Sequence, residues 1–418
     1  MDIIAYAIPF FLIAIVLEIV WGRRRGLDTY RLNDTFSSLM LGIMSQARKF
    51  VLLGIGGWVY QQVTDLTVVA LWPANAWVTW LVAFVLYDFC YYWLHRLGHE
   101  RQILWAAHVV HHQSEDYNLA TALRQTSTGF LLGWLFYIPM YIVGIPAHVI
   151  VTVGAINLIY QFWVHTQHVP ELGWFEWFFV SPSNHRVHHA QNDRYLDRNY
   201  GGVFIVWDRL FGTYQRELPD VPCIYGIRGA IRTWNPLVAL THIYTDIAND
   251  IRGARHWRDR LRVPIARTGW QPEAAAHQAL RLKNDLVAFE PYDPIVSQAV
   301  KIYAGVQLLF ATGLLAYGQL HTMSVAVYWL WWGLLMWTGV ATAAWLDARP
   351  WRYCVCIDAP RQLVVLASLS LVISDGPWQM AGLLLTIVSA VLLSSDWFDT
   401  KRTGQALASI ASQAVGKK

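Results

Sequence analysis

Nine long apolar runs divide this 418-residue chain, and they restrict its fold more than any other feature. A lipid bilayer offers no hydrogen-bond partners, so a segment that crosses it must satisfy its own backbone groups, as a helix does. Only 14% of the residues are charged, against about 25% in an average soluble domain. We therefore predict an all-α, polytopic integral membrane protein. The runs lie at 3–21, 38–60, 67–93, 128–146, 147–166, 302–320, 323–345, 361–374 and 377–395.

Basic residues between the runs predict the orientation of the chain. Arginines cluster after the first and seventh runs, whereas alternate loops such as 61–66 and 321–323 contain no Lys or Arg. Because cytoplasmic loops carry the excess of basic residues, we expect about nine spans, with the N-terminus outside and the C-terminus cytoplasmic. The net charge of +4 is modest and indicates no nucleic-acid partner.

Changes in polarity along the chain predict five parts. These are N-terminal membrane helices (1–66), a histidine-rich domain (67–215), a cytoplasmic or interfacial segment (216–300), C-terminal membrane helices (301–400) and a tail (401–418).

Histidines are concentrated in the second of these parts. Eleven of the 15 histidines fall between residues 95 and 189. Eight of them form three clusters, His95-x-x-x-His99, His108-x-x-His111-His112 and His185-x-x-His188-His189. Chance would give only about 0.02 H-x-x-H-H triplets in such a chain. Neutral imidazole binds iron, zinc and copper well, and eight imidazoles exceed the roughly six ligands of an octahedral ion. The pattern therefore predicts two metal ions on the cytoplasmic side.

The first cluster lies at the end of an apolar run that also contains a carboxylate. His95 and His99 are one helical turn apart and share a face with Asp88. A carboxylate inside a membrane span is costly, so Asp88 is a candidate functional residue. We expect it to accept a hydrogen bond from an imidazole N–H and fix its tautomer. The alternative is a structural role beside another polar group.

A second polar stripe contributes a further histidine. Asn157, Gln161 and His165 follow one another at four-residue spacing along an otherwise apolar run. This stripe directs His165 toward the same membrane face, and we take it as a ninth ligand.

The ligand chemistry favours an oxidative reaction. A hydrolytic zinc ion usually takes three protein ligands and a water, far fewer than the histidines present here. Non-heme iron keeps open positions for dioxygen and can activate it against an unreactive C–H bond. We therefore predict an oxygen-dependent di-iron oxidoreductase whose substrate is a lipid entering from the bilayer. A metal transporter is the distant alternative, but transporters tend to place their sites at the membrane midplane, between repeats.

The clusters also resemble a known family. Together with Asn199-Tyr200-Gly201-Gly202 and the stretch Trp207–Thr213, they resemble the fatty acid hydroxylase/sterol desaturase superfamily over roughly residues 80–215. Within it, the run His111–Gln125 and the stretch Gln161–Thr166 resemble the alkylglycerol monooxygenase family.

That resemblance implies a di-iron monooxygenase that hydroxylates the carbon next to a glyceryl ether oxygen. The hemiacetal formed would collapse to an aldehyde and a glycerol lipid. Tetrahydrobiopterin would supply the electrons, although Gln167 stands where we expect an acidic residue, and another donor is the alternative. The implied metal ligands are His95, His99, His108, His111, His112, His185, His188 and His189, with His165 added.

Other residues of these motifs are candidates for catalytic or substrate-side roles. The catalytic candidates are Asp88, Glu115, Asn118, Asn157 and Asn199, while Asp116, Tyr117 and Arg124 also match the closer motif. The same site could instead hydroxylate or desaturate a sterol, hopanoid, fatty acyl chain or ornithine lipid.

Overall fold

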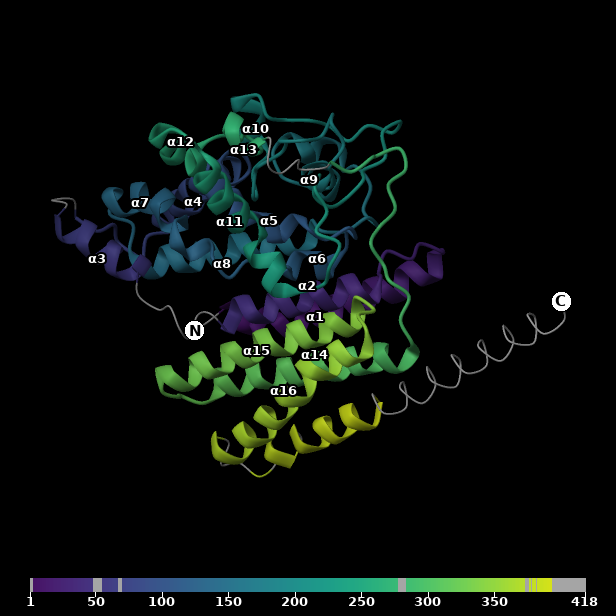
Figure 1. Cartoon of the computed structure of the whole chain (residues 1–418). Helices are drawn as coiled ribbons and strands as arrows, with labels where there is room; N and C mark the ends of the chain where they lie inside the picture. The colour runs from purple at the N-terminus through teal and green to yellow at the C-terminus, as the bar shows by residue number, and fades with distance from the viewer. Residues whose placement is uncertain are drawn as a thin grey trace, which may run out of the picture. The chain divides into compact units, whose positions relative to one another are not determined.

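The computed structural model describes residues 3–47, 55–66, 70–276, 283–372, 376, 378–380 and 382–392. The chain forms two compact units, and we describe each by itself. The first comprises Met1–Arg232 and Val238–Pro291, and the second comprises Thr233–Leu237 and Tyr292–Lys418. The described part is helical, and its β contacts are three isolated bridges (Figure 1). The predicted all-α class is confirmed.

The first unit contains most of the helices. In chain order they are α1 (Ile3–Arg25), α2 (Leu32–Ala47), α3 (Ile55–Leu66), α4 (Trp77–Glu100), α5 (Gln102–His112), α6 (Leu119–Leu123), η2 (Gly129–Leu131), η3 (Gly133–Tyr137), α7 (Ile138–Val143), α8 (Ala147–Trp163), η4 (Gly173–Trp177), α9 (Pro182–His189), α10 (Val206–Phe211), α11 (Pro236–Gly253, of which Pro236 and Leu237 belong to the second unit), α12 (Trp257–Arg262), η5 (Val263–Ile265) and α13 (Glu273–Ala276). The second unit contains α14 (Gln298–Leu320), α15 (Val325–Leu346) and α16 (Trp351–Val372).

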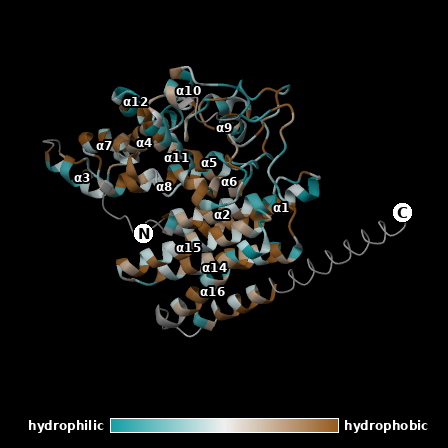
Figure 2. Ribbon diagram, in the orientation of Figure 1, coloured by the Kyte–Doolittle hydropathy of each residue, from teal (hydrophilic) through white to brown (hydrophobic). Residues whose placement is uncertain are grey.

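Four helices in the described part are long and apolar enough to cross a membrane. They are Tyr6–Arg25, Trp77–Glu100, Gln298–Leu320 and Val325–Leu346. Large apolar side chains on them are exposed, for example Phe10 (71%) and Leu309 (65%), as a lipid-facing surface requires. Hydrophobic residues run along α14 and α15, whereas hydrophilic residues gather around α9 (Figure 2). These are the features of an integral membrane protein.

The other predicted spans correspond to shorter or partly described segments. The run 128–146 is divided among η2, η3 and α7, and α7 ends at Gly144, whose φ of 87° stops the helix. The run 38–60 falls on α2 and α3, with residues 48–54 outside the described part. Part of the last run and the predicted tail 401–418 also lie outside it. A count of nine spans therefore stays a prediction.

Helix α4 is central to the first unit and packs against α5 and α8. Asp88 on α4 bonds to Asn157 on α8, and Tyr91 bonds to Gln161 one turn later, so the two helices run in the same direction. Apolar residues of α4, α7 and α8, including Ala83, form a buried cluster near the beginnings of α4 and α8. The C-terminal ends of α4 and α8 therefore reach the same side of the unit.

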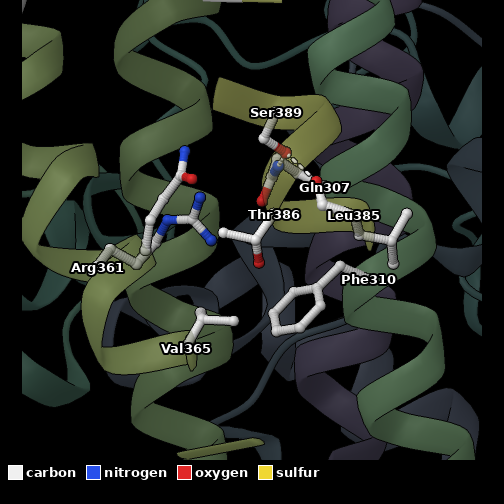
Figure 3. Close-up of a pocket in the computed structure, with 8 residues that line it drawn as sticks. Gln307, Phe310, Arg361, Val365, Leu385, Thr386 and Ser389 are labelled. Carbon is white, nitrogen blue, oxygen red and sulfur yellow. Dashed lines mark hydrogen bonds between the residues drawn. The ribbon is translucent and has the colours of Figure 1, made fainter. Parts of the chain in front are cut away.

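The second unit contains a buried polar cluster inside its helices. Arg361 and Asp358 form an ion pair with an N···O distance of 2.7 Å, and both side chains are only 2% exposed. The Tyr303 hydroxyl donates to Asp358 at 2.6 Å. Figure 3 shows Arg361 beside a small cavity, with the 2.7 Å hydrogen bond from Gln307 to Ser389 on its other side. The cavity volume is about 10 Å³, which is room for roughly one water molecule.

Candidate metal centre

Nine histidines of the first unit form two adjacent groups that could each hold a metal ion. The first histidine group consists of His95, His99, His108, His112 and His188. The second histidine group consists of His111, His165, His185 and His189. Within each group, one ring nitrogen per residue lies within 4.8 Å of all the others. All nine histidines suggested by the sequence therefore come together.

Helical periodicity explains how the triplets are divided between the groups. On α5, His108 and His112 are four residues apart and enter the first group, whereas His111 turns to the second. On α9 the arrangement is reversed, because His185 and His189 enter the second group and His188 enters the first. Each H-x-x-H-H motif thus gives two nitrogens to one group and one to the other.

The N-terminus of α9 is fixed by a buried carboxylate. Ser181 caps the helix by accepting from the Asn184 N–H, and Asn184 completes a capping box. Glu176 accepts hydrogen bonds from the Ser181 and Ser183 hydroxyls, each at 2.7 Å. Sequence reasoning missed Glu176, although a carboxylate shortly before a serine-rich helix start is a usable signal.

Burial keeps the imidazoles uncharged. Eight of the nine histidines are buried, and His108 is half-buried. Among those outside the membrane-spanning helices, burial lowers the pKa of His108, His112, His185, His188 and His189 well below its ordinary value and that of His111 to about 4. A neutral imidazole has a free lone pair, so these side chains are in the form that binds metal.

Backbone carbonyls fix the tautomers of four of the rings. Nδ1–H of His95 donates to the Tyr200 carbonyl at 2.8 Å, and Nδ1–H of His188 donates to the Arg198 carbonyl at 3.0 Å. His111 and His165 make the same bond to the Arg124 and Gln161 carbonyls, at 3.0 and 2.7 Å. With the proton held on Nδ1, the Nε2 lone pair is left for a metal ion.

The Nε2 atoms are spaced as ligands of a transition metal would be. Adjacent Nε2 atoms within the groups lie 3.0–3.2 Å apart. Two nitrogens at right angles around an ion at about 2.1 Å are separated by about 3.0 Å. His111 and His165 face each other at 3.2 Å with both protons on the far nitrogens, so two lone pairs oppose each other. A cation between them relieves this repulsion, and the residues present fit a metal ion.

Unpaired nitrogens support the same conclusion. Nε2 of His95 and Nε2 of His188 are buried without a hydrogen-bond partner in the described structure. Both belong to the first group. An unsatisfied buried polar atom is costly, and a metal ion would satisfy both of these.

Asp88 meets different partners from those expected. Its carboxylate accepts from the Asn157 amide at 2.7 Å, from the Val203 and Phe204 N–H groups at 2.8 and 3.0 Å, and from the Trp207 indole at 3.0 Å. The expected bond from an imidazole is replaced by bonds to α8, to the loop before α10 and to Trp207 in α10. The structural role is thus the one that the geometry supports.

Three other catalytic candidates also make structural hydrogen bonds. Asn118 caps α6 by accepting from the N–H groups of Ala120 and Thr121. Asn157 links Asp88 to Gln161. Asn199 donates to two backbone carbonyls, those of Asn184 and Gln215. Their contacts are those of residues that hold the site together.

Of the residues of the closer motif, Tyr117 and Arg124 contact the second group. The Glu115 N–H donates to Asp34, and the Glu115 side chain lies beside Gly226. Asp116 pairs with Arg31 at 2.8 Å. Tyr117 stacks on His165, with ring centroids 5.6 Å apart. The fully buried Arg124 donates to the Val110 carbonyl, the Ser37 hydroxyl and the Gln113 amide oxygen.

The chain is similar to a family of known enzymes. A model of the fatty acid hydroxylase family matches residues 80–213. The chain is 35% identical over 312 residues to alkylglycerol monooxygenase of Homo sapiens, covering 73% of this chain and 68% of that protein. Against the Danio rerio alkylglycerol monooxygenase it is 42% identical over 230 residues, 54% of this chain and 51% of that one. An ornithine lipid hydroxylase of Rhizobium tropici is 26% identical over 230 residues, 51% and 65% of the two chains. No solved structure matches the chain.

The chain therefore belongs to the fatty acid hydroxylase family, whose members are iron-dependent membrane enzymes. Among its relatives are the alkylglycerol monooxygenases, and the chain is an oxygen-dependent, lipid-acting monooxygenase of this class. The resemblance seen in its motifs is confirmed.

Proposed function

We propose that this monooxygenase is a di-iron enzyme that cleaves the O-alkyl bond of ether lipids. The observation that carries the metal assignment is the pair of adjacent histidine groups, with five and four convergent ring nitrogens. The identity of 35% to an alkylglycerol monooxygenase over 73% of the chain supports the substrate class.

The nine histidines would hold the two ions, and their backbone partners would keep each Nε2 directed inward. Bound iron would supply the activation of dioxygen and the removal of a hydrogen atom from an unreactive C–H bond. His108 is half-buried while the other eight histidines are buried, so the first group is the more open one. We place the approach of the lipid on that side.

The proposed reaction balances as a mixed-function oxidation. One oxygen atom of dioxygen enters the C–H bond next to the ether oxygen. The other oxygen atom is reduced to water by two electrons and two protons from the donor. The resulting hemiacetal breaks its C–O bond, which releases a fatty aldehyde and a glycerol lipid.

We propose tetrahydrobiopterin as the electron donor, because the run that begins at His111 resembles that of the alkylglycerol monooxygenase family. Gln167, the residue that departs from the expected pattern, donates to the Tyr117 carbonyl at 3.0 Å. The acidic residue expected at this position is absent, so another external electron donor is the alternative.

The proposed topology has about nine spans, an external N-terminus and a metal centre on the cytoplasmic side. Residues 216–300 would form a cap at the membrane surface. In support, Trp257, Leu261 and Ile265 are exposed at four-residue intervals along α12 and η5. Arginines lie between them, as in helices that rest on lipid headgroups.

Purification without oxygen, followed by metal analysis and turnover, tests the function. We expect about two irons per chain and an oxygen-dependent release of fatty aldehyde from an alkylglycerol with reduced tetrahydrobiopterin. The matched substrate control is an acylglycerol of the same chain length, which has no ether carbon to hydroxylate. Iron-free protein prepared under these conditions would contradict the metal assignment.

A second candidate function uses the same centre on another lipid. The similarity to an ornithine lipid hydroxylase favours hydroxylation of a different chain, and desaturation of a sterol or acyl group belongs to the same chemistry. Two irons per chain without aldehyde release would favour this candidate over ether cleavage.

A further inference from the structure

A four-residue segment, Asp197–Tyr200, contacts three of the five histidines in the first histidine group. The Arg198 carbonyl accepts from His188, and the Tyr200 carbonyl accepts from His95. The Asp197 carboxylate lies 3.8 Å from Nδ1 of His99. We call residues 197–200 the clamp segment.

The backbone of the clamp segment is held in an uncommon conformation. Asp197 and Asn199 have φ values of 57° and 55°, in the left-handed region that residues other than glycine rarely adopt. These two residues flank Arg198, and the conformation directs the carbonyls on either side of Asn199 toward imidazoles. Such strain persists only where surrounding contacts enforce it, and it concentrates at functional sites.

Two buried side chains enforce this conformation. Asn199 is fully buried, and its amide group bonds to the Asn184 carbonyl and to both backbone groups of Gln215. Asp208 accepts from the N–H groups of Tyr200 and Gly201, at 2.7 and 2.8 Å.

The glycines that follow the clamp segment allow this close packing. A Cβ on Gly201 would lie 2.5 Å from the Phe204 carbonyl oxygen. A Cβ on Gly202 would lie 2.8 Å from the carboxylate of Asp88, which binds the next two backbone N–H groups. The clamp segment is thus held by its own Asn199 side chain and by Asp208 of α10, while Asp88 of α4 holds the residues that follow it.

Two histidines of the second group, His111 and His165, are held by other parts of the chain. Their Nδ1 bonds run to the Arg124 carbonyl for His111 and to the Gln161 carbonyl for His165. These carbonyls follow α6 and lie within α8.

We propose that the clamp segment, with Asp208 as its positioning residue, sets the affinity of the first metal ion independently of the second. This inference rests on the proposed two-metal function. Residues that hydrogen-bond to metal-binding histidines change metal affinity by roughly 10–100-fold. Loss of the clamp segment's contacts should therefore lower the affinity of the first ion and leave that of the second unchanged.

The test compares Asp208→Asn with Glu176→Gln in the full-length enzyme, loaded with ⁵⁷Fe and washed with a weak chelator. An amide at 208 can accept with only one atom, so one of the Tyr200 and Gly201 N–H groups loses its partner. We expect about one iron per chain and a Mössbauer spectrum of isolated, uncoupled iron. Glu176→Gln weakens α9, which serves both groups, so both ions should be lost together.

Joint loss of both irons in Asp208→Asn, or retention of both with unchanged affinity, would overturn the proposal. Should that variant fail to fold, Asp197→Gly replaces it, since the Asp197 side chain is 61% exposed and glycine suits its φ. We expect this variant to keep its thermal stability while its first iron is released faster, and an unchanged release rate would contradict the clamp. If the wild-type enzyme itself binds fewer than two irons, the proposed function fails instead.

Discussion

His112 of the first histidine group stacks on His189 of the second, with ring centroids 4.3 Å apart and ring planes inclined by 22°. The two rings come from α5 and α9, which are 70 residues apart in the chain. This contact joins the two groups into one candidate dinuclear centre. In the proposed function, each of the two groups would hold one ion of this centre.

Removal of one histidine from either group should abolish turnover. We expect His111→Ala and His188→Ala each to lose metal and activity while the protein still inserts into membranes. In His111→Ala the second group keeps three nitrogens, and in His188→Ala the first keeps four. Metal analysis and detergent extraction from membranes check this, and full turnover by either variant would show that the ligand assignment is wrong.

Asp88→Asn should weaken metal retention by roughly 10–100-fold without abolishing it. An asparagine amide would turn its N–H groups toward two of the four N–H donors that now bind the carboxylate. The loop after the clamp segment would then shift, and the Tyr200 carbonyl that holds His95 would shift with it. Iron release to a chelator measures the effect.

A suitable control for Asp88 is Glu171→Gln, which breaks an exposed ion pair with Arg216. Exposed ion pairs contribute little to the stability of the fold, so this variant should retain iron as the wild type does. If Asp88→Asn retained iron as well as this control, Asp88 would have a role in packing alone.

The metal-free protein should lose stability as the pH falls below about 6.5, the ordinary pKa of histidine. The folded-state pKa of the buried histidines is lowered, to about 4 for His111, so the unfolded chain binds protons first. Each such histidine can remove up to about 1.4 kcal/mol per pH unit between the two pKa values, and none above the unfolded pKa. Thermal unfolding in detergent between pH 5 and 8 measures this. An apoprotein whose melting temperature rises on acidification would contradict the neutral state of these rings.

Arg361→Met should destabilise the second unit by about 3–5 kcal/mol, because it leaves the Asp358 carboxylate buried without its cation. The double variant Arg361→Met, Asp358→Leu removes both charges and should recover most of that loss. Thermal unfolding of the full-length protein in detergent compares the two. A double variant as unstable as the single one would show that the pair itself stabilises the unit.

The candidate site was largely predictable because metal ligands have narrow chemical requirements. All nine histidines were identified from spacing and residue type, and the structure brings them together. The supporting residues were harder to assign, since a carboxylate such as Asp88 can serve an imidazole or a backbone N–H equally well. Asp208 carries no spacing signal toward the histidines, and its partners became clear only in three dimensions.

The sequence by itself determined the helical class, the membrane environment and the metal-binding chemistry, because hydrocarbon excludes unpaired backbone groups and imidazole selects its metals. Only the tertiary structure decided how the histidines divide into groups of five and four, and which carbonyls hold them. Those relationships join three parts of the chain that are separated in sequence: α4 with α5, α8, and α9 with the clamp segment. Packing between such elements depends on side chains from all of them at once. It therefore cannot be predicted from the periodicity of any one segment.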